Sequence, residues 1–220
     1  MDFALARRNM IETQIRTNKV TDTLVVEALE TLPRENFVSD SLKNRAYLDE
    51  DLNLGGGRIL MEPMVLGRLM HAAHIEETDL ALVIAAASGY EAAAIAHIAS
   101  AVVAIEPNED LYTQVSQNMV DQGADTVTVL KGELAKGHPG QGPYDVIFIN
   151  GAVAELPDSL VEQLADGGRL VYVKTSPNDV LGAGKAVLVS KLDGVVSATE
   201  LFDANIPALP EFAAAPKFNF

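Results

Sequence analysis

The chain has 220 residues, 48% of them hydrophobic, so it can bury one substantial core and its length requires no second domain. Sixteen basic and thirty-one acidic residues give a net charge of −15, which argues against nucleic acid and membrane surfaces as partners. The chain has no cysteine, residues 1–20 lack the apolar stretch of a signal peptide, and no run is apolar enough to cross a membrane. We therefore expect a cytoplasmic protein without disulfides.

The N-terminal part, residues 1–75, is predicted to form a helical cap and a covering segment. Apolar residues at helical spacing predict helices in three ranges: 3–16, 22–32 and from Pro63 to just before Glu76. Thr21 or Asp22 is the expected N-cap of the second helix, and Pro33 terminates it. Residues 34–60 show no sustained period and contain three consecutive glycines, which indicates an extended segment with a tight turn.

The next part, residues 79–203, alternates between short apolar strands and helices. Strands are predicted at 79–85, 101–105, 126–130, 144–149, 168–174, 184–191 and 195–203, and helices at 90–99, 108–122 and 159–164. This alternation predicts a parallel sheet with helices on both faces. The Asp193-Gly194 turn adds an antiparallel hairpin at its end. Such an ending fits a methyltransferase-type sheet better than that of a nicotinamide-dependent dehydrogenase, in which the later strands stay parallel.

The remaining residues, 205–220, are predicted to form an extended strap over the surface of a single domain. They contain three prolines, Pro207, Pro210 and Pro216, which disfavour a regular helix or a central strand. An aromatic ring of the terminal Phe218-Asn219-Phe220 is expected to pack into a surface groove.

A candidate ligand site begins where the apolar run from Leu82 meets the small residues Ala85–Gly89. Glu106 ends the next apolar run, and a carboxylate about twenty residues after such a turn is typical of an α/β nucleotide site. The turn is expected to present backbone N–H groups to a ligand beyond the strand ends. Glu106 is placed to accept hydrogen bonds from both ribose hydroxyls, and Glu133 to accept one from a base amino group.

Each of these features also has a purely structural interpretation. Tight packing of a helix on a strand is the alternative for Ala85-Ala86-Ala87, because Cβ atoms there crowd the path of a ligand. Glu106 before Pro107 is alternatively an acid at a helix N-terminus, and Glu133 a solvated loop acid.

Two other features are weak as functional signals. His71 and His74 have a spacing able to bind a metal ion, but no third ligand is visible, so we predict no metal site. Ser88 has no neighbouring general base in the sequence, which argues against a nucleophile.

From about residue 8 to about residue 175, the chain resembles the protein-L-isoaspartate (D-aspartate) O-methyltransferase family. The matching stretches are Met10–Ile15, Leu32–Val38, Ala46–Asp49, Ser88–Ala93, Pro143–Ile147 and Gln163–Leu170. The resemblance implies an α/β fold of the class I S-adenosylmethionine-dependent methyltransferases, with a mostly parallel seven-stranded sheet, an antiparallel terminal hairpin and an N-terminal helical cap. It also implies S-adenosylmethionine as cofactor and methyl transfer to the carboxylate of an isoaspartyl residue in a protein or peptide.

The chain departs from the family pattern in the cofactor turn. The family pattern is acid-x-Gly-x-Gly-Ser-Gly-Tyr, and here Val83 replaces the acid, while Ala85 and Ala87 replace the first two glycines. Ser88 and Gly89 match the pattern, and Glu106 matches the ribose-binding acid.

Two further segments depart as well. Glu133 stands where the family has the aspartate of a Gly-Asp-Gly run, and Leu134 replaces the last glycine. The family's Thr-Ile-Ser segment, which helps to hold the substrate and active centre, appears as Ile59-Leu60-Met61. The catalytic position of its serine is thus Met61, where the hydroxyl is lost and the acceptor pocket becomes apolar.

These observations leave two main hypotheses. The first is a divergent carboxyl O-methyltransferase with reduced activity or a changed acceptor. The second is a non-catalytic relative that keeps the fold for protein binding or scaffolding. A nicotinamide-dependent oxidoreductase is a distant third because of the strand pattern.

Overall fold

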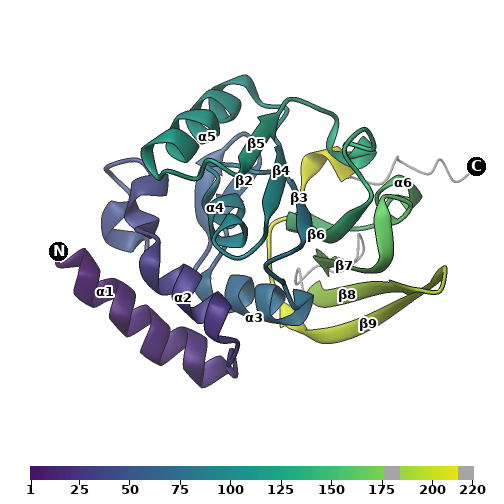
Figure 1. Ribbon diagram of the computed structural model, residues 1–220. Coiled ribbons are helices and arrows are strands. Elements are labelled where there is room, and N and C mark those ends of the chain that lie inside the picture. The colour runs from purple at the N-terminus through teal and green to yellow at the C-terminus, as the bar shows by residue number, and fades with distance from the viewer. Residues whose placement is uncertain (176–183, 213–220) are drawn as a thin grey trace, which may run out of the picture.

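The centre of the computed structural model, which describes residues 1–175 and 184–212, is a seven-stranded sheet with the order β5-β4-β3-β6-β7-β8-β9 (Figure 1). The strands are β3 (Leu80–Ile84), β4 (Ala101–Ile105), β5 (Val127–Leu130), β6 (Tyr144–Val153), β7 (Leu164–Lys174), β8 (Gly184–Leu192) and β9 (Val195–Ala204). Strands β3 to β7 pair in parallel, whereas β8 pairs antiparallel with β7 and β9 antiparallel with β8. These directions confirm the predicted parallel sheet that ends in an antiparallel hairpin.

The helices begin close to their predicted positions. They are α1 (Phe3–Met10), α2 (Thr23–Thr31), α3 (Pro63–Ala73), α4 (Tyr90–Ala96), α5 (Glu109–Asp121) and α6 (Asp158–Val161). After α1 the chain continues as a π-helix to Ile15, so the predicted first helix is helical throughout but not uniformly α. The carboxylate of Asp22 caps α2 by accepting hydrogen bonds from the backbone N–H groups of Leu24 and Val25.

The covering segment contains more structure than its sequence pattern indicates. Short 3₁₀ helices span Arg34–Phe37 and Lys43–Arg45, and a hairpin joins β1 (Leu52–Gly55) to β2 (Arg58–Leu60). All three glycines at its turn have positive φ, a backbone conformation that residues with a Cβ rarely adopt. The triple glycine therefore makes the tight turn predicted from it.

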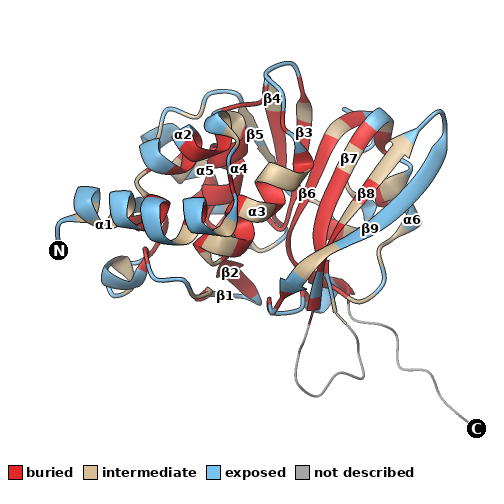
Figure 2. Ribbon diagram, turned by 90° about the horizontal axis from the view of Figure 1, so that it is seen from below, coloured by how far each residue is buried: buried red, intermediate tan, exposed pale blue. Residues whose placement is uncertain are grey.

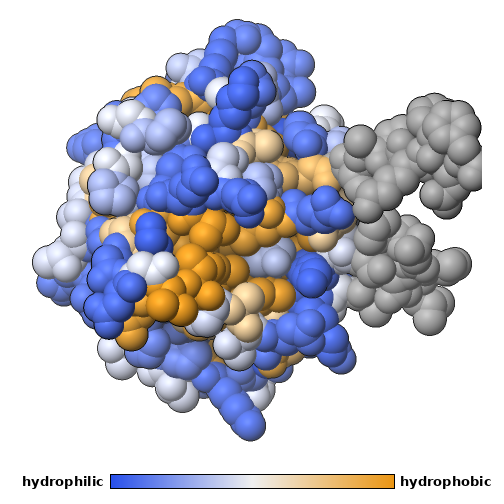
Figure 3. Space-filling model, turned by 90° about the vertical axis from the view of Figure 1, so that its right-hand side faces the viewer, coloured by the Kyte–Doolittle hydropathy of each residue, from blue (hydrophilic) through white to orange (hydrophobic). Residues whose placement is uncertain are grey.

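The two faces of the sheet are covered unequally, which differs from the predicted two helical layers. Helices α2 to α5 all contribute to a hydrophobic cluster on one face, as the arrangement of the helices in Figure 2 shows. Within residues 1–175 and 184–212, the other face carries only α6 and two short 3₁₀ helices, η5 (Leu134–Lys136) and η6 (Pro210–Phe212). Residues 131–143, which join β5 to β6, contain four glycines and two prolines, and these disfavour a long covering helix. Hydrophobic side chains gather in the middle of the side of the molecule seen in Figure 3.

The β8-β9 hairpin forms one edge of the sheet, and β9 is exposed along most of its length (Figure 2). Its turn residues Asp193 and Gly194 have φ values of 50° and 74°, as a tight hairpin turn requires. We expect Gly194→Ala to lower the free energy of unfolding by about 1 kcal/mol, because alanine resists positive φ. Urea unfolding of this variant beside Gly140→Ala, at an exposed glycine without positive φ, measures the effect, and equal losses would contradict it.

Among the residues that the structure describes, no helix has the length and apolar character needed to cross a bilayer.

Candidate functional site

The turn after β3 keeps a backbone shape suited to glycine although two of its residues are alanines. The φ angles are 62° at Ala85, 53° at Ala87 and 92° at Gly89. An alanine held at positive φ costs about 1–2 kcal/mol, so both alanines are in an unfavourable conformation. All three residues are buried at the carboxyl end of the strand, where α/β folds place their ligands.

The backbone N–H groups of this turn are used within the protein. The Ala86 N–H donates to the carbonyl of Ile105 at 2.9 Å, and the Gly89 N–H to that of Ala86 at 2.7 Å. The Ala87 N–H donates to Oε2 of Glu106 at 2.9 Å. The structure thus brings the turn and Glu106 together as expected, but these three donors face protein acceptors rather than an open cleft.

The carboxylate of Glu106 is fully buried, and both of its oxygens are engaged. Oε1 accepts the N–H of Asn108 at 3.1 Å. Oε2 accepts a hydrogen bond from Nε of Arg58 at 3.0 Å in addition to the one from the Ala87 N–H. Arg58 comes from β2, and its side chain also has no exposed surface. A guanidinium therefore lies against the carboxylate to which the sequence assigned the ribose hydroxyls.

Arg58 is held from its other side by the C-terminal part of the chain. Its two terminal nitrogens donate to the carboxylate of Glu211, at 3.2 Å and 2.7 Å, in a bidentate ion pair. The side chain of Glu211 is 36% exposed, so this pair lies at the border between solvent and the buried Arg58–Glu106 pair.

The described end of the chain, residues 206–212, lies along the end of β6 and is called the strap below (Figure 1, yellow). The Ala152 N–H donates to the carbonyl of Pro207 at 3.0 Å, and the Leu209 N–H to that of Ala152 at 2.9 Å. Gly151 lets this segment approach, because a Cβ there would lie 2.5 Å from Cγ of Leu209. Residues 213–220, with the predicted aromatic anchor Phe218-Asn219-Phe220, lie outside the described residues.

The strap is anchored mainly by apolar side chains. Leu209 and Phe212 are buried in one hydrophobic cluster with Ala85, Ile105 and Leu134. This cluster joins the turn after β3, the end of β4 and η5, which are the elements that the sequence analysis placed around the ligand. Leu134 therefore packs against side chains of the strap and of the turn after β3.

Glu133, in contrast, points into solvent. Its side chain is 72% exposed and forms an ion pair with Lys136 at 2.7 Å. Its position is that of the solvated loop acid, the structural alternative to a base-binding residue.

The segment Ile59-Leu60-Met61 is buried and offers no hydroxyl. The Met61 N–H donates to Oε1 of Glu91 at 3.3 Å, and the guanidinium of Arg34 donates to the Met61 carbonyl. These contacts fix the backbone of the segment, while its side chains pack into the core.

Three carboxyl groups near this segment have raised pKa values. Burial raises the pKa of Glu91 to about 7, and Oε2 of this residue has no partner among the described residues. Burial raises the pKa of Asp51 to about 6, and burial with the nearby charges of Asp51 and Asp49 raises that of Glu62 to about 7. Asp51 accepts the N–H of Glu62 at 2.8 Å, and Asp49 that of Met64 at 3.1 Å, so both acids help to cap α3.

The remaining candidates lie away from this site or lack partners. The rings of His71 and His74 are 6.2 Å apart, and no group of three metal-ligating side chains occurs in residues 1–175 and 184–212. The Ser88 hydroxyl is buried without a hydrogen-bond partner among these residues.

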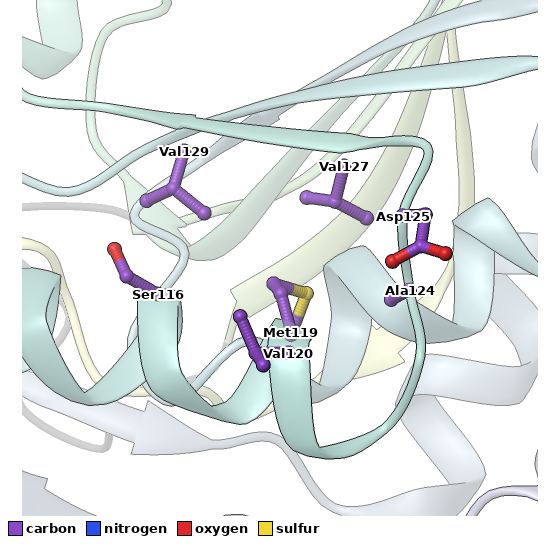
Figure 4. A pocket seen from close by; sticks show the side chains of 7 residues that line it. All are labelled: Ser116, Met119, Val120, Ala124, Asp125, Val127 and Val129. Atoms are coloured by element: carbon purple, nitrogen blue, oxygen red, sulfur yellow. The ribbon is translucent and has the colours of Figure 1, made fainter.

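Four surface cavities have volumes of about 270–370 Å³, and none of these four is lined by the turn after β3 or by Glu106. One of them lies between α5 and β5, where Val120, Val127 and Val129 line it together with Met119 (Figure 4).

Arg58, Glu211 and Leu209 belong to this site although the sequence did not predict them there. The signal for Arg58 is weak, since an arginine directly before the apolar Ile59-Leu60 requires an anion only if it is buried, and its burial is known from the structure. Nothing in the sequence pairs it with Glu106, which lies 48 positions further along the chain.

Comparisons with known proteins agree with the fold. The family model for protein-L-isoaspartate(D-aspartate) O-methyltransferase matches residues 6–188. The protein-L-isoaspartate O-methyltransferase of Koribacter versatilis is 35% identical over 175 residues, which are 80% of this chain and 79% of that protein. That of Methanoculleus marisnigri is 34% identical over 165 residues, 75% of each chain.

Solved structures show the same architecture. One protein-L-isoaspartate O-methyltransferase superposes with a TM-score of 0.79 at 23% identity, over 92% of this chain and 65% of that longer one. A Plasmodium falciparum structure described as such an enzyme in complex with S-adenosyl-L-homocysteine has a TM-score of 0.77 at 18% identity, over 93% and 98% of the two chains. At these identities the structures establish the class I methyltransferase fold.

Proposed function

Because this chain belongs to the protein-L-isoaspartate(D-aspartate) O-methyltransferase family, we propose that it is a methyltransferase for protein or peptide carboxylates whose activity is reduced by closure of its cofactor cleft. Family membership supports S-adenosylmethionine as methyl donor and an isoaspartyl carboxylate as acceptor. Such a carboxylate is already a nucleophile, so the protein needs to supply position and a dry site rather than a general base.

The Arg58–Glu106 ion pair is the main observation that supports a reduced activity. In the described conformation the residues do not fit S-adenosylmethionine, because both oxygens of Glu106 are engaged and Glu211 covers Arg58. The positive φ of Ala85 and Ala87 adds two Cβ atoms to the turn that the cofactor would approach. Methyl transfer by this chain thus requires that the cleft open.

The acceptor is the second point of divergence. Met61 stands at the position of the family serine and is fully buried, so no hydroxyl is available there to hold a substrate carboxylate. We therefore expect a weaker preference for isoaspartyl over other carboxylates than in relatives with the serine.

Calorimetric titration with S-adenosylmethionine, followed by methanol release from an isoaspartyl peptide and from its aspartyl counterpart, tests this function. We expect weak binding and methyl transfer that is slow but dependent on the peptide. If millimolar S-adenosylmethionine produces no heat and no thermal shift, the methyltransferase is ruled out in favour of the second candidate.

That second candidate is a non-catalytic protein that uses the methyltransferase fold as a binding or scaffold module. The complete burial of Glu106 and Arg58 favours it, because a permanently filled cleft needs no cofactor. The two functions differ in one measurable property, which is whether S-adenosylmethionine binds.

Restoring glycines in the turn is expected to strengthen binding of S-adenosylmethionine. The double variant Ala85→Gly and Ala87→Gly removes both Cβ atoms while leaving a backbone that already has positive φ at these positions. We expect its affinity to rise by about tenfold, equivalent to about 1.4 kcal/mol, in calorimetric titration. Ala86→Gly is the matched control, because Ala86 lies between them without positive φ. An unchanged affinity of the double variant would show that the alanines are not the obstruction.

A further inference from the structure

We propose that Ile206–Phe212 is a built-in occupant of the cofactor cleft, and that S-adenosylmethionine binds this protein only by displacing it. The inference rests on the proposed function in one respect, namely that the cleft after β3 and β4 is the inherited cofactor site. What goes beyond the proposed function is that one segment of this chain, residues 206–212, competes with the cofactor.

The first step is the position of the segment. It contacts the β1-β2 turn and the end of β6, and η6 packs beside η5. A Cβ on Gly57 would lie 2.8 Å from Cγ of Pro210, and one on Gly151 would lie 2.5 Å from Cγ of Leu209. These elements border the carboxyl ends of β3, β4 and β6, so the segment crosses the region where α/β folds bind nucleotides.

Second, side chains of the protein occupy the cleft with the same kinds of surface that a nucleoside ligand would present. A nucleoside ligand presents an apolar ring system and a polar ribose, and the cleft here receives an apolar and a polar group from the protein itself. Leu209 and Phe212 supply apolar surface beside Ala85, Ile105 and Leu134. Arg58, held by Glu211, supplies the hydrogen-bond donor to Glu106.

Third, the polar contacts of the segment, which add to the apolar anchors Leu209 and Phe212, are few and can be exchanged. Its backbone makes two hydrogen bonds to Ala152, and its only ion pair among the described residues, Glu211 with Arg58, is partly exposed to solvent. The carboxylate of Glu211 is 36% exposed, so water can solvate it when the pair opens, and opening does not require the sheet to unfold. The ion pair of Glu211 with Arg58 therefore holds the segment in place, and the side chain of Leu209 fills apolar space beside the turn after β3.

The test uses the full chain with Glu211→Gln, with Leu209→Ala, and with both. The matched control is Asp203→Asn, which removes the surface ion pair of Asp203 with Lys185 on β8 and leaves the strap untouched. Circular dichroism establishes that each variant is folded. S-adenosyl-L-homocysteine binding is measured by calorimetry, and amide hydrogen exchange is followed at Ala152 and Leu209, whose N–H groups hold the strap.

We expect saturating S-adenosyl-L-homocysteine to accelerate exchange at Ala152 and Leu209 in the wild-type protein. The double variant is expected to bind this ligand about tenfold more tightly, because less of the population has the cleft occupied. The control variant is expected to bind like the wild type.

Two results would overturn the proposal. One is binding to the wild type with exchange at both amides unchanged, which would mean that the strap does not leave. The other is a folded double variant that exchanges rapidly at both amides yet binds no better than the wild type, which would assign the closure to Arg58 and the alanines. Binding with strap release but without methanol formation would contradict the proposed function and leave this inference intact.

Discussion

Replacing Arg58 by alanine is expected to lower the free energy of unfolding by about 3–5 kcal/mol. The substitution leaves the carboxylate of Glu106, which has no exposed surface, without its cation and with only the N–H groups of Ala87 and Asn108. An uncompensated buried charge is costly because water cannot replace the lost partner. Urea unfolding at pH 7, followed by circular dichroism, measures this loss.

Arg45→Ala is the matched control, because Arg45 pairs with Glu50 at a similar distance of 2.9 Å but in a half-exposed setting. Such pairs contribute about 0.2–1 kcal/mol. Combining Arg58→Ala with Glu106→Gln should recover part of the loss, since the amide removes the buried charge. If Arg58→Ala is no more harmful than Arg45→Ala, the buried pair is not the structural element described here.

Glu91→Gln is expected to raise the free energy of unfolding at pH 8 by about 2–3 kcal/mol. Burial raises the pKa of Glu91 from 4.5 to about 7, so the folded protein favours the protonated acid. The stability that this proton confers is fully present below pH 4.5, declines as the pH rises, and is lost above about pH 7. A neutral glutamine keeps an oxygen to accept the Met61 N–H and has no charge to bury.

Chemical unfolding of both proteins at several pH values from 4 to 8 tests this prediction, and the difference between the two curves is the informative quantity. Asp51 and Glu62 also have raised pKa values, and because the charge of Asp51 helps to raise the pKa of Glu91, the difference between the curves includes the coupling of these two acids. Glu109→Gln, at an exposed carboxylate on α5, should run parallel to the wild type throughout. A Glu91→Gln curve that also runs parallel would show that Glu91 does not lose its proton in this range.

The buried carboxyl group of Glu91 and the closed cleft lie in the same part of the molecule. Glu91 and Arg34 both bind the backbone of Met61, and the preceding residues of this segment lead back to Arg58 in β2. The segment that corresponds to the family's substrate site is thus fixed by buried polar groups at one end and by the Glu106 ion pair at the other. The large effects expected for both variants follow from the low dielectric of these positions.

The sequence by itself determined the order of strands and helices, because their signals are local. Apolar runs such as Ala101–Ile105 have the length of a buried strand, Asp22 caps a helix over a few residues, and Asp193-Gly194 defines a hairpin turn. The small-residue turn before Gly89 and the carboxylate of Glu106 were likewise placed together correctly, since both end neighbouring parallel strands.

Only the tertiary structure decided what fills the site. Arg58, Glu106 and Glu211 are separated by 48 and 105 positions along the chain, and no local pattern links an arginine to acids that far away. The exposed Glu133 and the buried Leu134 are adjacent, yet they face opposite environments because Phe212 and Leu209 arrive from the end of the chain. Local propensity sets the backbone, whereas the burial of a charge is decided by every segment that packs around it.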